Sequence, residues 1–131
     1  MSSAGARRHR LIGVLIIGAL VVGCAYLGRV ALLSVGATEG DVPPGSSLSL
    51  PLGSSIVSEN TECASGGCWT TFEVRPPEGQ SPAGLAGELG ALPQASMPGN
   101  FIDPRTVWLW AEPHENVLIL RADYWSSEWV P

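Results

Sequence analysis

Two cysteines, Cys63 and Cys68, have the spacing that most clearly predicts chemistry in this chain. They enclose Ala-Ser-Gly-Gly, a turn-forming stretch that can bring two Cα atoms within the several ångströms that a disulfide requires. Redox-active pairs usually have the Cys-x-x-Cys spacing at a helix N-terminus, and this pair is spaced differently. We therefore predict a structural disulfide in an oxidising compartment, with about 2 kcal/mol of stabilisation from its short loop.

Other residue types that support catalysis or metal binding are sparse. His114 lies beside Glu112 and Glu115 in an expected turn, whereas a protein zinc site usually needs three or four converging ligands. Ser65 lies in Ser-Gly-Gly, without the Gly-x-Ser-x-Gly pattern of a nucleophile elbow. We therefore expect no catalytic residues, no metal site and no cofactor, and we predict that the protein is not an enzyme.

The aromatic content is concentrated in tryptophan. Trp108 and Trp110 alternate with Val107 and Leu109, so the two indoles lie on the same side of the expected strand. One interpretation is that these rings extend a thin core, which we favour. The other is that Trp108 and Trp110 form an exposed binding surface for sugar rings or for a protein partner. Five tryptophans follow the apolar N-terminal part: Trp69, Trp108, Trp110, Trp125 and Trp129.

These residues follow an apolar run, 11–36, that can cross a bilayer. About 20 apolar residues span the hydrocarbon core, and this run has one charge, Arg29, near its end, where the side chain can reach the interface. Basic residues precede the run, and such residues stay in the cytoplasm. We predict a cytoplasmic N-terminus (1–10), a transmembrane helix (11–36) and an extracytoplasmic remainder in the cell membrane.

An alternative for the same run is a cleaved leader. The sequence Val-Val-Gly-Cys ending at Cys24 resembles a lipobox, the motif at which bacterial lipoproteins are cleaved and lipidated on cysteine. Residues 25–36 remain mostly apolar, whereas a lipoprotein usually continues with a polar tether. We favour the uncleaved helix and keep lipidation of Cys24 as the alternative.

The outer part of the chain is acidic. From Glu39 onward, three arginines oppose twelve acidic residues, a net charge of −9, and the chain contains no lysine. Such a charge repels nucleic acid backbones and anionic lipid headgroups. We divide this part into a Pro/Gly/Ser-rich stalk (37–54) and one small domain (55–131), because some 90 residues suffice for a single modest core.

Local patterns in the domain predict the order β-β-α-β-β. Strands are expected at 56–57 and 69–75, separated by turn residues 60–67, and again at 106–111 and 117–124. In 69–75, Thr70, Phe72 and Val74 share the core face. The last two strands are joined by a short link, so they should be antiparallel neighbours. In the last strand, Leu118, Leu120 and Ala122 should face the core, and Arg121 and Asp123 should face water.

A short helix is expected between the second and third strands. Ser81 and Pro82 form a typical helix start, and Leu85, Leu89 and Leu92 recur on one side of the helix. The loop 94–104 should then place Phe101 or Ile102 over the core. The expected fold class is α+β: one transmembrane helix followed by a small β-β-α-β-β domain with one disulfide.

The expected function follows from topology more than from chemistry. A tethered acidic domain without a catalytic constellation suggests a protein-interaction module of the cell envelope. The alternative is a cell-wall glycan-binding module that uses exposed tryptophans. Expected partners are therefore the membrane and either another envelope protein or cell-wall glycan, and not nucleic acid.

Overall fold

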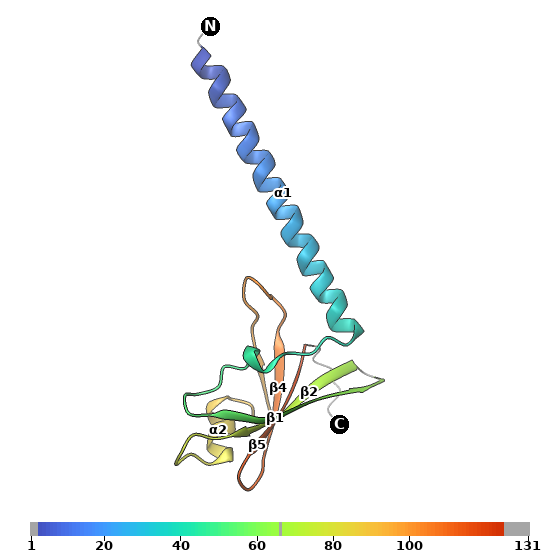
Figure 1. Ribbon diagram of the computed structural model, residues 1–131, viewed down its shortest axis with the longest axis vertical. Helices are drawn as coiled ribbons and strands as arrows, with labels where there is room; N and C mark the ends of the chain where they lie inside the picture. The colour runs from blue at the N-terminus through green and yellow to red at the C-terminus, as the bar shows by residue number, and fades with distance from the viewer. Residues whose placement is uncertain (1–2, 66, 125–131) are drawn as a thin grey trace. The chain divides into compact units, whose positions relative to one another are not determined.

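The computed structural model describes residues 3–65 and 67–124. The chain divides into two compact units, Met1–Leu33 and Ser34–Pro131. The first unit belongs to helix α1 (Ser3–Glu39), drawn in blue in Figure 1. Within α1, residues Arg7–Ala37 are long and apolar enough to cross a membrane. At 1.5 Å per residue, these 31 residues extend about 46 Å, which exceeds a hydrocarbon core of about 30 Å. A signal sequence passes the same test of length and composition.

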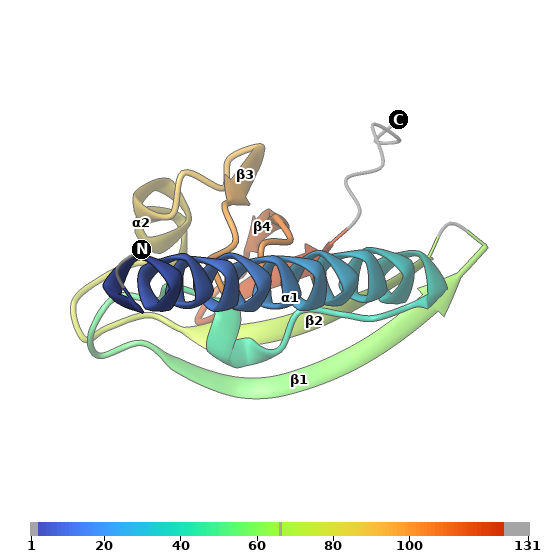
Figure 2. The same cartoon turned by 90° about the horizontal axis from the view of Figure 1, so that it is seen from above.

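The second unit contains a five-stranded antiparallel sheet in the order β1-β2-β5-β4-β3. The first two strands form a long curved hairpin, which is clearest in Figure 2. Strand β5 then joins this hairpin to β4 and β3, so the first and last strands in the chain are separated by only one strand. The strands are β1 (Ser55–Ala64), β2 (Gly67–Arg75), β3 (Gln94–Met97), β4 (Val107–Pro113) and β5 (Leu118–Asp123).

Alternation along the strands gives the sheet two chemically different faces. Register partners point to the same face of a sheet, so the pairs Phe72–Leu120 and Leu109–Ala122 define a common apolar side, which we call the first face. Its central side chains are almost completely buried. The members in the three middle strands are Thr70, Phe72, Val74, Val107, Leu109, Leu118, Leu120 and Ala122.

Helix α2 (Pro82–Glu88) packs on the first face against β4 and β5. The Ser81 hydroxyl accepts a hydrogen bond from the Gly84 amide at 3.0 Å, and Pro82 occupies the first helical position, as the sequence predicts. Leu85 and Ala86 are fully buried in the core. Because the helix is short, we attribute most of its stability to this packing.

The chain between α1 and β1 also contributes to the core. It contains a short 3-10 helix, η1 (Gly45–Ser47), and its Pro43 and Leu48 are buried. Gly45 approaches the sheet so closely that a Cβ there would lie 3.3 Å from the Phe72 ring. Part of the segment 37–54, which we predict as a stalk, therefore packs on the first face where it is formed by the β1–β2 hairpin.

The expected fold class is confirmed at the level of an apolar N-terminal helix and a small disulfide-containing α+β sheet domain. The order of strands differs, because Gln94–Met97 forms β3 where the sequence predicts a loop. Its Ala95 and Met97 pack against the core through their β4 partners Leu109 and Val107. Four residues are too few for an alternating pattern, so only pairing with β4 reveals this strand.

The expected extent of the first strand is wrong. The sequence predicts a strand at 56–57 and a turn at 60–67, whereas β1 continues to Ala64. Its polar residues are tolerated because β1 is an edge strand and is largely exposed, and its pairing with β2 supplies the hydrogen bonds.

Three expected burial states are also corrected. Leu92 is 51% exposed because α2 ends at Glu88 and Gly90 adopts a positive φ of 65°, which turns the chain away from the helical face. Phe101 and Ile102 are 79% and 69% exposed, because η1, Leu48 and α2 already cover the core. Asp123 lies on the expected side of β5, opposite Ala122, but it is only 5% exposed.

Candidate functional site

The disulfide between Cys63 and Cys68 is present, with its two Cα atoms 4.0 Å apart at the tip of the β1–β2 hairpin. The chain that leaves α1 lies beside it. Gly40, with φ of 113°, would place a Cβ only 2.9 Å from the Cys68 sulfur. Cys24 is a free, exposed thiol on α1. The hairpin tip is therefore close to the first residues after the apolar helix.

His114 and Ser65 are both exposed, and no catalytic arrangement surrounds them in the described part of the chain. The His114 Nε2 lies 3.6 Å from a Glu112 carboxylate oxygen, in a solvent-exposed pair. Among the described residues, no group of three histidine, cysteine or acidic side chains converges as a metal site would require.

The second face of the sheet, opposite the core, carries tryptophans on adjacent strands. Trp108 and Trp110 project there from β4, since Val107 and Leu109 occupy the first face. Trp69 projects to the same side from β2, because it alternates with the buried Thr70 and Phe72. We call these three tryptophans and Arg121 the aromatic face. All three rings are half-buried.

Arg121 connects the rings of the aromatic face. Its guanidinium carbon lies 3.9 Å from the centroid of the Trp69 ring and 5.7 Å from that of Trp110, both within cation–π range. This arrangement follows from the register, in which Arg121 of β5 pairs with Thr71 of β2 and with Trp110 of β4. The cation therefore lies between strands that bear aromatic rings.

Carboxylates border the aromatic face. Glu62 accepts a hydrogen bond from the Trp69 indole nitrogen at 3.0 Å. Glu73 and Glu112 are both register partners of Ile119, so they lie on the same side as Arg121, one strand away on either side of β5. Three carboxylates therefore lie on this side of the sheet with two arginines, Arg121 and Arg75, which leaves a small excess of negative charge.

The sequence singles out Trp108 and Trp110 for this face but not Trp69 or Arg121. The sequence feature that could have identified Trp69 is its position two residues before Thr71, because alternate residues of a strand share a face and Thr71 is expected to face away from the core. Trp125 and Trp129 lie outside the described residues.

A second cluster, the Arg105 cluster, joins segments that are distant in sequence. Arg105 donates to both carboxylate oxygens of Asp103, at 2.9 and 2.8 Å, and to Asp41 at 3.0 Å. Its guanidinium also stacks on Tyr124, 3.8 Å from the ring centroid. Asp41 lies two residues after the end of α1, so the cluster joins the start of the second unit to the β3–β4 loop and to Tyr124, the residue after β5.

The electrostatics of this cluster favour the ionised pair. Hydrogen bonds from Arg105 lower the pKa of Asp103, which outweighs the opposite effect of its partial burial. The Asp103 carboxylate in turn raises the pKa of Arg105. Burial raises the pKa of Tyr124, so its hydroxyl remains neutral at physiological pH.

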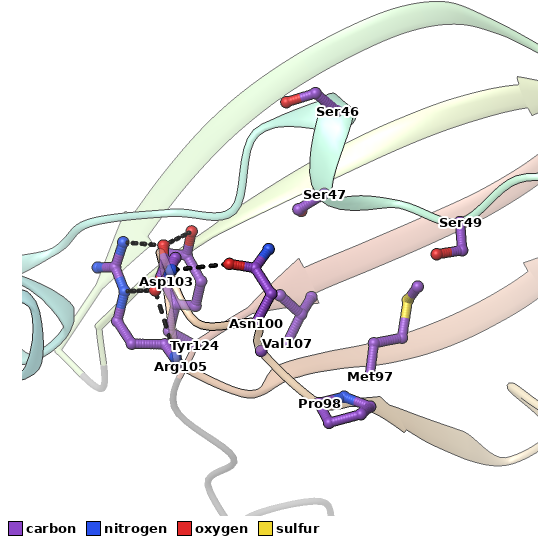
Figure 3. Close-up of a pocket in the computed structure, with 11 residues that line it drawn as sticks. Ser46, Ser47, Ser49, Met97, Pro98, Asn100, Asp103, Arg105, Val107 and Tyr124 are labelled. Carbon is purple, nitrogen blue, oxygen red and sulfur yellow. Dashed lines mark hydrogen bonds and ion pairs between the residues drawn. The ribbon is translucent and has the colours of Figure 1, made fainter.

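A polar cavity of about 270 Å³ lies beside the Arg105 cluster, between η1 and the β3–β4 loop (Figure 3). Three serines and Asn100 line it together with Met97 and Val107. The side-chain Oδ1 of Asn100 accepts hydrogen bonds from the backbone amides of Ile102 and Asp103, which orders the loop that forms one wall. Because all three Arg105 nitrogens already donate to carboxylates, we assign the cluster a structural role.

Comparison of the chain with protein-family models, with curated proteins and with solved structures gave no match. The geometry of the chain itself therefore carries the functional argument.

Proposed function

We propose that this chain is a single-pass protein of the cell membrane whose extracytoplasmic domain is a protein-interaction module of the cell envelope. The observation that carries the proposal is the Trp69–Arg121–Trp110 stack on the second face of the sheet. Tryptophan and arginine are the residues most enriched in binding hot spots, where they bring large, ordered contact areas. Of the elements in the described residues, both α2 and η1 pack on the first face, so neither of them covers the aromatic face.

Charge asymmetry supports the proposed orientation. Arg7, Arg8 and Arg10 precede the apolar part of α1, whereas all twelve acidic residues follow it. By the positive-inside rule, this distribution favours a cytoplasmic N-terminus. The Cys63–Cys68 disulfide supports an oxidising location for the domain.

Co-purification of the full-length protein from crosslinked membranes tests the interaction. Arg121→Ala removes the central cation, and Trp110→Ala removes an adjacent ring; each should reduce partner recovery at least tenfold. Phe101→Ser is the matched control, because Phe101 is an exposed aromatic residue outside the aromatic face. Unchanged recovery with both Arg121→Ala and Trp110→Ala would contradict the proposal.

A glycan-binding module is the second candidate, favoured by Trp108. This half-buried ring has polar Ser96 as its register partner, an arrangement suited to stacking against a sugar ring. The full-length protein in detergent should then sediment with purified cell wall, and Trp108→Ala should release it. Wall binding that persists in Trp108→Ala would exclude this use of the aromatic face.

Lipidation of Cys24 remains the alternative form of anchoring. Metabolic labelling with a palmitate analogue should leave the wild-type chain unlabelled if the helix is retained intact. Label that disappears in Cys24→Ser would instead identify a lipoprotein.

A further inference from the structure

We infer that the aromatic face recognises a cationic, arginine- or lysine-bearing segment of the partner protein. This inference rests on the proposed function and specifies the chemistry of the partner. It depends on two observations on the same face of the sheet: tryptophan rings arranged around a guanidinium, and carboxylates at the border of those rings.

Arg121 shows how this face accommodates a cation. Tryptophan is the aromatic residue that attracts cations most strongly, and the Arg121 guanidinium is within reach of two indole rings at once. Trp108 lies two residues before Trp110 on the same side of β4 and is half-buried. An incoming guanidinium or ammonium group can therefore stack on Trp108 as Arg121 stacks on Trp69.

Charge complementarity selects the same partner. Glu73 and Glu112 flank Ile119 next to the row that contains Arg121 and Trp110. Together with Glu62 they are three carboxylates against two arginines on this side of the sheet, Arg121 and Arg75. The chain from Glu39 onward contains twelve acidic residues against three arginines, so its overall field also attracts basic segments. A second copy of the same domain would be repelled.

Titration of the full-length protein in non-ionic detergent with a short oligo-arginine peptide tests the inference. Tryptophan fluorescence reports binding, and oligo-glutamate and glycine-serine peptides of equal length are the comparison probes. Oligo-arginine should bind, the other two should not, and raising the salt from about 50 to about 300 mM should weaken binding about tenfold, because exposed charges are screened.

Two double variants separate a specific surface from general attraction. Glu73→Gln with Glu112→Gln should weaken oligo-arginine binding about tenfold. Glu78→Gln with Glu88→Gln removes the same charge from α2 and the loop before it, and should change binding less than twofold. Equal weakening by both doubles would overturn the inference, because binding would then depend on net charge alone.

The same variants distinguish this inference from the proposed function. One outcome would overturn the inference of a cationic segment while leaving the interaction module in place. In it, Arg121→Ala abolishes recovery of the membrane partner, but neither higher salt nor the Glu73/Glu112 double variant changes that recovery. Salt-insensitive binding to purified wall glycan that Trp108→Ala abolishes would also overturn it. Partner loss in the Glu73/Glu112 double, but not in the Glu78/Glu88 double, would support it.

Discussion

Asp103→Asn removes the charge that holds the Arg105 cluster together. In the wild-type domain, the two Asp103 oxygens accept hydrogen bonds from Arg105 at 2.9 and 2.8 Å. The Arg105 side chain is only 12% exposed, so its charge has limited access to water. Asparagine preserves the size of the side chain but offers one neutral oxygen in place of a bidentate carboxylate.

The expected cost is about 2 kcal/mol of unfolding free energy. A hydrogen bond to a charged group contributes about 1.5 to 3 kcal/mol when buried, and we take the lower part of this range because Asp103 is 33% exposed. Asp41→Asn is the matched control. Its carboxylate is 57% exposed, so loss of its ion pair with Arg105 should cost about 0.5 kcal/mol.

Urea unfolding of the full-length protein in mild detergent, followed by tryptophan fluorescence, measures both variants. The pH dependence gives a second signature. Because the folded state lowers the pKa of Asp103 below its ordinary value of 3.8, this carboxylate stabilises the fold above that pH. The contribution is lost as the pH falls through the lowered pKa, so the difference between wild type and Asp103→Asn should shrink as the pH falls below about 3.8.

A difference below about 0.5 kcal/mol at pH 7 would refute the assigned role of Asp103. So would a larger loss in Asp41→Asn than in Asp103→Asn, because the order of the two effects follows directly from their exposure.

Three further predictions concern the core, the disulfide and the topology. Phe72→Ala should cost about 4 kcal/mol in the same urea assay, since Phe72 is fully buried between the sheet and η1, and a loss below about 1 kcal/mol would contradict that packing. Replacing both Cys63 and Cys68 with alanine should lower the free energy of unfolding by about 2 kcal/mol. Mass spectrometry of alkylated, unreduced wild-type protein should find both cysteines unlabelled, and alkylation of both would contradict the disulfide. Protease added to intact cells should digest the domain beyond Glu39, whereas a domain protected until lysis would contradict the proposed orientation.

The sequence alone determined the elements that depend on local chemistry. The apolar composition of α1 predicts a membrane-length helix, and Ser81-Pro82 predicts the start of α2, because a hydroxyl cap and a first-position proline act within one helical turn. Alternation places Trp108 and Trp110 opposite Val107 and Leu109, because a strand has a period of two wherever its partners lie. The Cys63–Cys68 bond is likewise local, since its two residues are separated by only four others.

Only the tertiary structure decided which strands became neighbours and which side chains met. The pairing of β5 with both β2 and β4 brings Arg121 to Trp69 and Trp110, although no pattern within β5 indicates an aromatic partner. Likewise, Asp41 and Arg105 are 64 residues apart and form an ion pair because η1 covers the core and leads the chain past the β3–β4 loop. Such contacts depend on register and long-range packing, which are set when the whole first face is buried, whereas periodicity and caps act within a few residues.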